Sequence, residues 1–459
     1  MSGALRQLFN TKKRDVDMTA GGISGHLIRF AIPLLLGNIL QQLYNMVDTW
    51  VVGNYVSGEA FSAVGTVGPI INLLVGFFMG LSSGAGVVVS QYYGAHREKD
   101  VRRTVHTAMA VTFIVGVVLS IIGVLMVPTM LDLIKTPAEV RDEAAVYLNT
   151  YFSGLLGLVV YNMGAGILRS VGDSQRPFYF LALCALANTV LDLVFVLAFD
   201  MGVFGVALAT ILSQGVSALL VVITLMQSKN CVRFSFRGLR IHGDVLGKIV
   251  KIGLPTALQM AITSFSNIFV QSYVNYFGTA AMGGWTAYAK IDQLVMLPMQ
   301  SLSLACTTFV GQNLGNGDVT RAKRGVRVAL AIACGATAVI IIPIVLFAPS
   351  LVIFFNDDPE IVSFGTLFLR WLTPFYILCC VNQIYAGVLR GAGKSAATMV
   401  ITLASFVGFR QLYLFITANF ISNTVIPIAM GYPAGWLLCS CLMFFYYRCV
   451  KLEKGRIVT

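Results

Sequence analysis

Residues 27–53, LIRFAIPLLLGNILQQLYNMVDTWVVG, are the stretch that decides the fold class. It is long enough to cross a bilayer, for which a helix needs about 20 apolar residues. Pro33 removes a backbone donor and is expected to bend this helix, so we take it as the candidate hinge. Asp48 places a carboxylate about four turns further along. Because an acid inside a span usually faces a protein interior or a water-filled cavity, we interpret this helix as the wall of a transport pathway.

Apolar runs of similar length recur as far as residue 447. The chain has 459 residues, of which 57% are hydrophobic and 11% are charged. These features predict an all-α polytopic membrane protein with twelve transmembrane helices. The nine cysteines and four histidines show neither a disulfide framework nor metal-ligand spacing. The expected spans are 27–53, 60–83, 105–128, 145–168, 178–199, 202–227, 247–277, 280–310, 325–348, 362–388, 396–419 and 422–447.

The basic residues predict the orientation in the membrane. Most of the 32 Lys and Arg fall in loops on one side of the predicted topology, whereas the opposite loops hold Lys135 and Arg141 among several acids. Because cytoplasmic loops carry the excess of positive charge, we expect a multi-pass protein of the inner (plasma) membrane with both termini cytoplasmic. The net charge of +12 is then explained by topology, and we expect no nucleic-acid partner. The expected partners are small-molecule substrates and the lipid bilayer, and the expected state is a monomer.

The second half of the sequence repeats the first at an offset of 221 or 222 residues. The matching segments are LIRFAIP (27–33) with IVKIGLP (249–255), SQYYG (90–94) with GQNLG (311–315), and GILRSVGDS (166–174) with GVLRGAGKS (387–395). Six helices in each half start both halves on the same side, so the repeats are parallel and form two pseudo-symmetric six-helix bundles. The predicted organisation is a cytoplasmic tail (1–26), an N-terminal bundle (27–227), a cytoplasmic linker (228–246), a C-terminal bundle (247–447) and a cytoplasmic tail (448–459).

Several motifs point to one family over essentially the full length. They are IPLLLGN and NMVDTWVVG in the first span, SQYYGAHREKDVRR after the second, then GILRSVGDSQRP, NTVLDLVFV and GVFGVALATILSQ, with the second-half copies GQNLG and GVLRGAGKS. In this order they resemble the multidrug and toxic compound extrusion (MATE) family. The resemblance implies a secondary active antiporter that exports organic, often cationic, drugs or metabolites in exchange for H⁺ or Na⁺ by alternating access. We expect no cofactor besides that coupling ion.

Acids inside the spans are the candidate coupling residues. Asp48 and Asp192 lie in the first and fifth spans, and Asn188 precedes Asp192 by four residues, on the same helix face. With the Thr210 hydroxyl, these oxygens suit a small hard cation such as Na⁺. They suit a proton equally, because burial and a neighbouring acid both favour a protonated carboxyl. The resemblance implies such a site in the N-terminal bundle, on these matching positions. The alternative is that the four residues only hold helices together by hydrogen bonds.

The C-terminal bundle differs, because the repeat partners of Asp48 and Asp192 are Val270 and Tyr413. Its acid is Asp292, which either forms a structural charge cluster with basic residues in the spans or meets cationic substrate or a proton. Those basic residues are Lys290, Arg370 and Arg410. The candidates for lining the substrate cavity are Gln41, Tyr44, Asn45, Asn162 and Asp292.

Two other functions were weighed against export. A flippase for a lipid or a lipid-linked precursor, from the same superfamily, would show more spans and a strongly basic cavity. A membrane-embedded enzyme would need His, Asp or Ser gathered near a membrane face, and the histidines are not placed for that, so we do not expect an enzyme. The sequence also lacks GxxxxGK[ST], which excludes a P-loop and with it ATP as the energy source.

Overall fold

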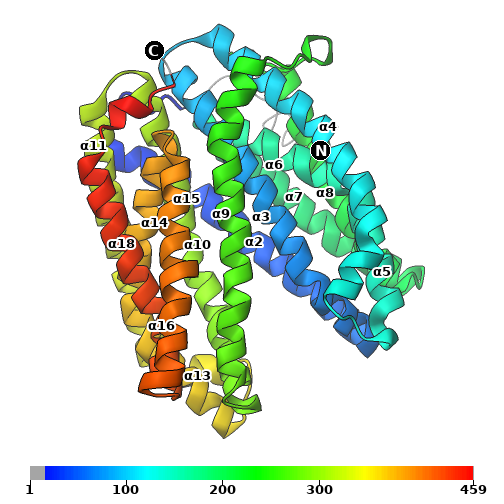
Figure 1. Cartoon of the computed structure of the whole chain (residues 1–459). Coiled ribbons are helices and arrows are strands. Elements are labelled where there is room, and N and C mark those ends of the chain that lie inside the picture. The colour runs from blue at the N-terminus through cyan, green and yellow to red at the C-terminus, as the bar shows by residue number, and fades with distance from the viewer. Residues whose placement is uncertain (1–15, 458–459) are drawn as a thin grey trace. The chain divides into compact units, whose positions relative to one another are not determined.

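The structure is a computed structural model that describes residues 16–457. Most of the predicted N-terminal tail and the last two residues lie outside this range. Every regular element in residues 16–457 is a helix (Figure 1). The helices are α2 (Ile23–Tyr55), α3 (Gly58–Gly94), α4 (Glu98–Leu133), α5 (Ala138–Ser153), α6 (Leu155–Ser170), α7 (Gln175–Leu193), α8 (Gly202–Gln227), α9 (Gly243–Asn275), α10 (Thr279–Gly315), α11 (Val319–Leu346), α12 (Ala348–Ile353), α13 (Pro359–Leu372), α14 (Tyr376–Gly391), α15 (Ser395–Leu403), α16 (Arg410–Ile416), α17 (Val425–Ala429) and α18 (Gly431–Cys449).

The predicted number of spans is confirmed. Eleven helical runs in the described part of the chain are long and apolar enough to cross a membrane. The helices α5 and α6 are bent by 48° at their junction and count together as a twelfth span. Large apolar side chains are exposed on the spans, for example Leu125 and Val339. These exposed side chains suit contact with lipid, because a bilayer does not penalise apolar surface.

The chain divides into two compact units, each with its own packing. Unit 1 comprises residues 1–17 and Ile32–Leu254, and unit 2 comprises Met18–Ala31 and Pro255–Thr459. Both divisions fall beside a proline inside a long helix, at Pro33 in α2 and at Pro255 in α9. The sequence ranges had placed the starts of the bundles at residues 27 and 247. The first turns of α2 are therefore part of unit 2, and the first turns of α9 are part of unit 1.

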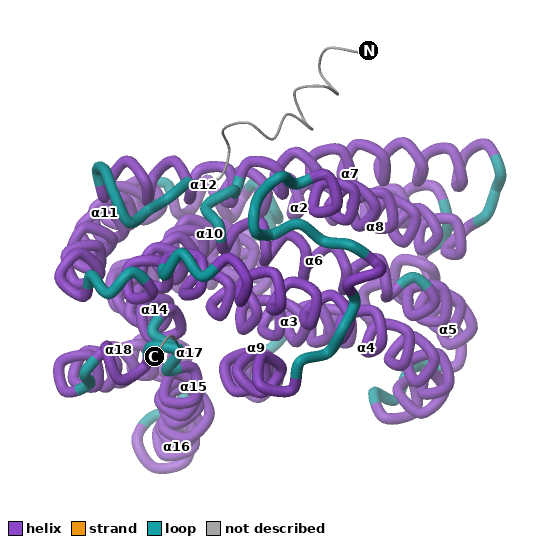
Figure 2. Tube along the Cα trace, turned by 90° about the horizontal axis from the view of Figure 1, so that it is seen from above, coloured by secondary structure: helices purple, strands orange, loops and turns teal. Residues whose placement is uncertain are grey.

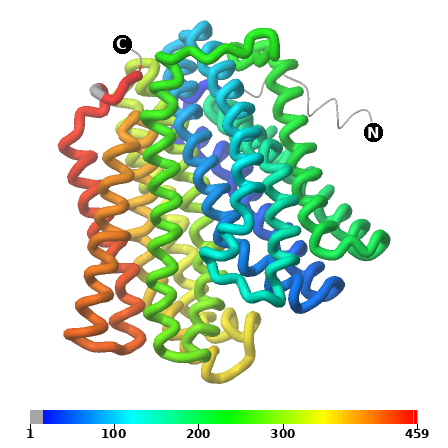
Figure 3. Tube along the Cα trace, turned by 45° about the vertical axis from the view of Figure 1, so that its right-hand side comes forward, coloured from blue at the N-terminus to red at the C-terminus, as the bar shows by residue number. Residues whose placement is uncertain are grey.

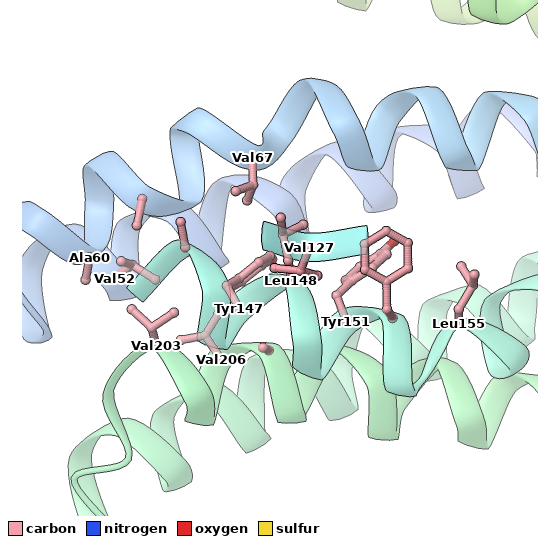
Figure 4. Close-up of a cluster of buried hydrophobic side chains, with 14 of the residues drawn as sticks. Val52, Ala60, Val67, Val127, Tyr147, Leu148, Tyr151, Leu155, Val203 and Val206 are labelled. Atoms are coloured by element: carbon pink, nitrogen blue, oxygen red, sulfur yellow. The ribbon is translucent and has the colours of Figure 1, made fainter. Parts of the chain in front are cut away.

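Close helix packing in unit 1 depends on small residues and short hydrogen bonds. The Ser82 hydroxyl of α3 donates to the Asn162 carbonyl of α6 at 2.6 Å, beside Gly166. Apolar side chains from α2, α3, α5 and α8 fill the adjoining core around Tyr147 and Tyr151, as Figure 4 shows. Small residues let helix backbones approach closely, and a polar contact then fixes the pair of helices.

Unit 2 repeats this contact with the same spacing in sequence. The Ser303 hydroxyl of α10 donates to the Gln383 carbonyl of α14 at 2.6 Å, and Gly387 lies beside Ser303. Ser303 and Gln383 follow Ser82 and Asn162 by 221 residues, the offset of the sequence repeat. Figure 2 shows α14, α15, α16 and α18 gathered in this unit. The repeat therefore extends from the motifs to individual contacts between helices.

The segment 228–246 is bound to unit 1. Figure 3 shows it in green at the top of the view, between α8 and α9. Phe234 is buried and packs against His106 of α4, whose ring nitrogen accepts a hydrogen bond from the Ser235 amide at 3.2 Å. The Lys248 ammonium, in the first turns of α9, donates to the Tyr92 hydroxyl at 2.7 Å. Although its composition is that of a flexible connection, this linker is anchored through buried contacts.

Candidate functional site

Two acids far apart in the sequence meet inside unit 1. Asp48 lies on α2 and Asp192 on α7, with 8% and 0% of their surface exposed. The two carboxyl groups face each other within hydrogen-bonding range. Oδ1 of Asp48 and both oxygens of Asp192 are buried, and no protein donor reaches them. A buried carboxyl without a donor is costly, so the pair is suited to hold a proton or a small cation.

The helix that carries Asp192 changes its winding directly after the site. Residues Val194–Ala198 continue α7 as a π-helical turn. Such turns are uncommon and occur frequently at functional sites, because the wider turn rotates the side chains that follow it. The π-helical turn marks this end of α7 as locally specialised.

The other two predicted ligands contribute less directly. Asn188 is buried on the same helix one turn before Asp192, and neither its amide oxygen nor its amide nitrogen has a hydrogen-bond partner. Thr210 is also buried, but its hydroxyl donates to the Val206 carbonyl within α8 at 3.0 Å. Thr210 can therefore offer an ion only the lone pairs of its oxygen. The structure brings Asp48 and Asp192 together and leaves Asn188 a turn away.

Tyrosines on α5 complete the surroundings, and sequence reasoning missed them. Tyr147 is buried near both carboxyl groups, and Tyr151 stacks on it with ring centroids 6.4 Å apart. Tyr151 in turn lies beside the Gln214 side chain of α8. The sequence did hold a signal, namely two tyrosines four residues apart in the predicted span 145–168, which must share a helix face.

The predicted cavity residues of unit 1 have different environments. Tyr44 is buried near Asp48 and next to Gln41, so both belong to the carboxyl site. Asn45 is exposed. The Asn162 amide donates to the Leu158 carbonyl of its own helix at 2.9 Å. Only the first two are thus grouped with the acids by these contacts.

The expected charge cluster around Asp292 does not form. Lys290 and Arg370 are exposed, and no ion pair within residues 16–457 includes Asp292. The Tyr288 hydroxyl donates to the Asp292 carboxyl at 3.4 Å, and Tyr376 of α14 lies beside it. The prediction of a salt-bridge cluster was wrong because the angular positions of these side chains on their helices are set by packing, which hydropathy does not report.

Comparison with known proteins identifies the family. The MatE family model matches twice, at residues 33–194 and 255–416, which together cover well over half of the chain. The chain belongs to the MATE family. The probable multidrug resistance protein YpnP of Bacillus subtilis is 29% identical over 96% of this chain and 99% of its own, and YoeA of the same organism is 28% identical over 93% of each. The outward-facing structure of a multidrug resistance MATE transporter superposes with a TM-score of 0.90 at 23% identity, covering 97% of this chain and 99% of that one.

These matches decide several of the sequence predictions. The resemblance to MATE proteins is confirmed, as is the architecture of twelve helices in two repeated bundles. MATE proteins are multidrug efflux transporters, so the chain is a multi-pass membrane transporter and not an enzyme. The matched segments also align the halves, because both contain 162 residues and their ends differ by 222.

Proposed function

We propose that this MATE transporter is a secondary active antiporter that exports organic, often cationic, compounds across the plasma membrane. Asp48 and Asp192 are proposed to couple export to the entry of a proton, with both termini of the chain in the cytoplasm. The observation that supports the coupling site most directly is the contact between two buried carboxyl groups that no protein donor reaches.

A proton suits this arrangement better than Na⁺. Two adjacent carboxylates repel each other in apolar surroundings, and a shared proton removes the repulsion without further ligands. A sodium site would need more oxygen ligands around the ion, and the Thr210 hydroxyl already donates within its own helix. Loading and release of the proton would change the charge of α2 and α7. That change can shift a conformational equilibrium if the two transport states bind the proton with different affinity.

Transport by reconstituted protein tests the proposal. Ethidium efflux is followed in proteoliposomes under an imposed pH gradient, and separately under an imposed Na⁺ gradient. We expect export with the pH gradient alone. Asp48→Asn and Asp192→Asn should each reduce export to the rate of protein-free vesicles, because Asn keeps the shape of the side chain but cannot carry the proton.

The matched control is Asp357→Asn, which changes an exposed acid in the loop before α13. It should export at the normal rate, and all three variants should elute as folded protein on size exclusion. Export by the wild type with the Na⁺ gradient alone would replace the proton by Na⁺ in the proposal. Normal gradient-driven export by both the Asp48 and the Asp192 variant would remove these acids from the coupling mechanism.

A further inference from the structure

Unit 2 buries a guanidinium near the middle of a span. Arg410 begins α16, within the helical run Ser395–Ile421, and only 3% of its surface is exposed. It follows directly on the π-helical segment Ala404–Phe409. No carboxylate in residues 16–457 lies within ion-pair distance of it. A charged residue in a span is expensive and, as a rule, is paired or serves a pathway.

The hydrogen bonds of Arg410 are incomplete. One terminal nitrogen, Nη2, donates to the Ser266 hydroxyl and to the Asn267 side-chain oxygen, both at 2.9 Å. Its Nε–H is buried and has no acceptor. The groups around it are neutral, because the partners on α9 are a hydroxyl and an amide. The arginine is therefore held in place while its charge is left without a counter-ion.

Aromatic rings separate this charge from the acid of the same unit. The guanidinium carbon lies 4.8 Å from the ring centroid of Tyr432. Ring contacts continue from Tyr432 to Trp285 at 5.5 Å and from Trp285 to Tyr288 at 4.9 Å. Tyr288 donates to Asp292. Asp292 is thus engaged at the far end of a row of rings and does not form an ion pair with Arg410.

The repeat shows that unit 2 differs from unit 1 at this place. Counted from the ends of the two matched segments, Arg410 occupies the position of Asn188, one turn from the acid of unit 1. By the same offset of 222, Ser266 and Asn267 occupy the positions of Tyr44 and Asn45. Equivalent helices therefore carry a site for a proton in one unit and a buried cation in the other.

We infer that Arg410, with Ser266 and Asn267 as its supports, forms a binding site for an oxyanion, the carboxylate or phosphate group of an exported organic compound. The guanidinium fork and an adjacent hydroxyl are suited to such a group, which would bond to the donor edge that includes Nε. Tyr432 and Trp285 offer flat surfaces for the aromatic part of the same compound. This inference rests on the proposed export function and adds anionic and zwitterionic compounds to its substrates.

A matched pair of dyes tests the inference by binding, without any gradient. Rhodamine 110 carries a free carboxylate, and rhodamine 123 is its methyl ester. Fluorescence polarisation measures the affinity of each dye for the purified full chain in detergent. Arg410→Gln should weaken binding of rhodamine 110 by about 10- to 100-fold, the loss expected for hydrogen bonds to a charged group. Binding of rhodamine 123 should stay within about twofold, because the ester offers no anion.

Further variants separate recognition from folding. Arg410→Lys keeps the charge without the fork and should give an intermediate affinity for rhodamine 110, and Arg370→Gln, an exposed arginine of the same unit, should change neither affinity. Benzoate and phenyl phosphate should raise the melting temperature of the wild type and not that of Arg410→Gln. Whichever of the two stabilises more identifies the preferred oxyanion.

The inference is overturned if Arg410→Gln and Arg410→Lys weaken both dyes equally, as a structural role would. It is also overturned if the wild type neither binds rhodamine 110 nor is stabilised by either anion. Asp48→Asn should bind rhodamine 110 normally, because its acid belongs to unit 1. Normal binding together with no gradient-driven export by the wild type would refute the proposed antiport and leave the oxyanion site standing.

Discussion

At the scale of single residues, close helix contacts depend on the absence of a side chain. A Cβ atom added to Gly84 of α3 would meet the backbone of Gly253 on α9, where the two helices pack in unit 1. Backbone atoms cannot move aside as the end of a flexible side chain can. Glycine at residue 84 is therefore required by the space between two helices and not by its own backbone conformation, which is helical.

Gly84→Ala is accordingly expected to destabilise the protein by about 1–3 kcal/mol, the usual cost of overpacking. Gly65→Ala, on the same helix, is the matched control, because no atom lies within 4 Å of the added methyl group. That variant should be stabilised by about 0.5–1 kcal/mol, since alanine favours a helix over glycine. Thermal unfolding of both variants in detergent gives the comparison. Equal melting temperatures for the two would contradict the close approach of α3 and α9.

At the scale of elements, the prolines of α2 and α9 coincide with the divisions between compact units. The divisions lie at Ala31/Ile32 and Leu254/Pro255, and both helices continue through them. A proline inside a helix removes one backbone hydrogen bond and clashes with the preceding turn, so the helix bends more easily there. Pro128 of α4 provides a contrast, because it lies within unit 1 alone.

Pro33→Ala should therefore slow transport without lowering the melting temperature, because the restored hydrogen bond stiffens α2 and does not weaken its packing. Pro255→Ala should behave in the same way. Pro128→Ala serves as the control and should transport at the wild-type rate. The measurement is dye efflux from proteoliposomes at equal protein content. Wild-type rates for both Pro33→Ala and Pro255→Ala would exclude the two prolines as hinges.

At the scale of the whole molecule, charge placement and linker packing describe the same face. The segment 228–246 carries Lys229, Arg233, Arg237 and Arg240 and is anchored to unit 1 by the burial of Phe234. The acidic loop around Asp357 follows an odd number of predicted spans and therefore belongs to the opposite side. This arrangement makes a topological prediction that does not depend on transport.

A cysteine introduced by Arg237→Cys should resist an impermeant maleimide added to intact cells and react once the membrane is opened. Asp357→Cys is the counterpart and should react in intact cells. Both positions are exposed, so accessibility within the protein does not limit either reaction. Labelling is scored above that of the parent, whose nine native cysteines set the background. Reaction of the Arg237→Cys protein in intact cells would reverse the proposed orientation.

The sequence by itself determined the spans, the parallel repeat and the family, because hydropathy and motif spacing are properties of the chain read locally. It also identified Asp48 and Asp192, since an acid stands out in an apolar run. Only the tertiary structure decided that these two meet and that Tyr147 lies beside both. The tertiary structure also decided that Asp292 lies with Tyr288 instead of with the basic residues expected near it. The physical reason is that the facing of each side chain depends on helix rotation, which packing sets and π-helical turns shift. No local pattern in the sequence records that rotation.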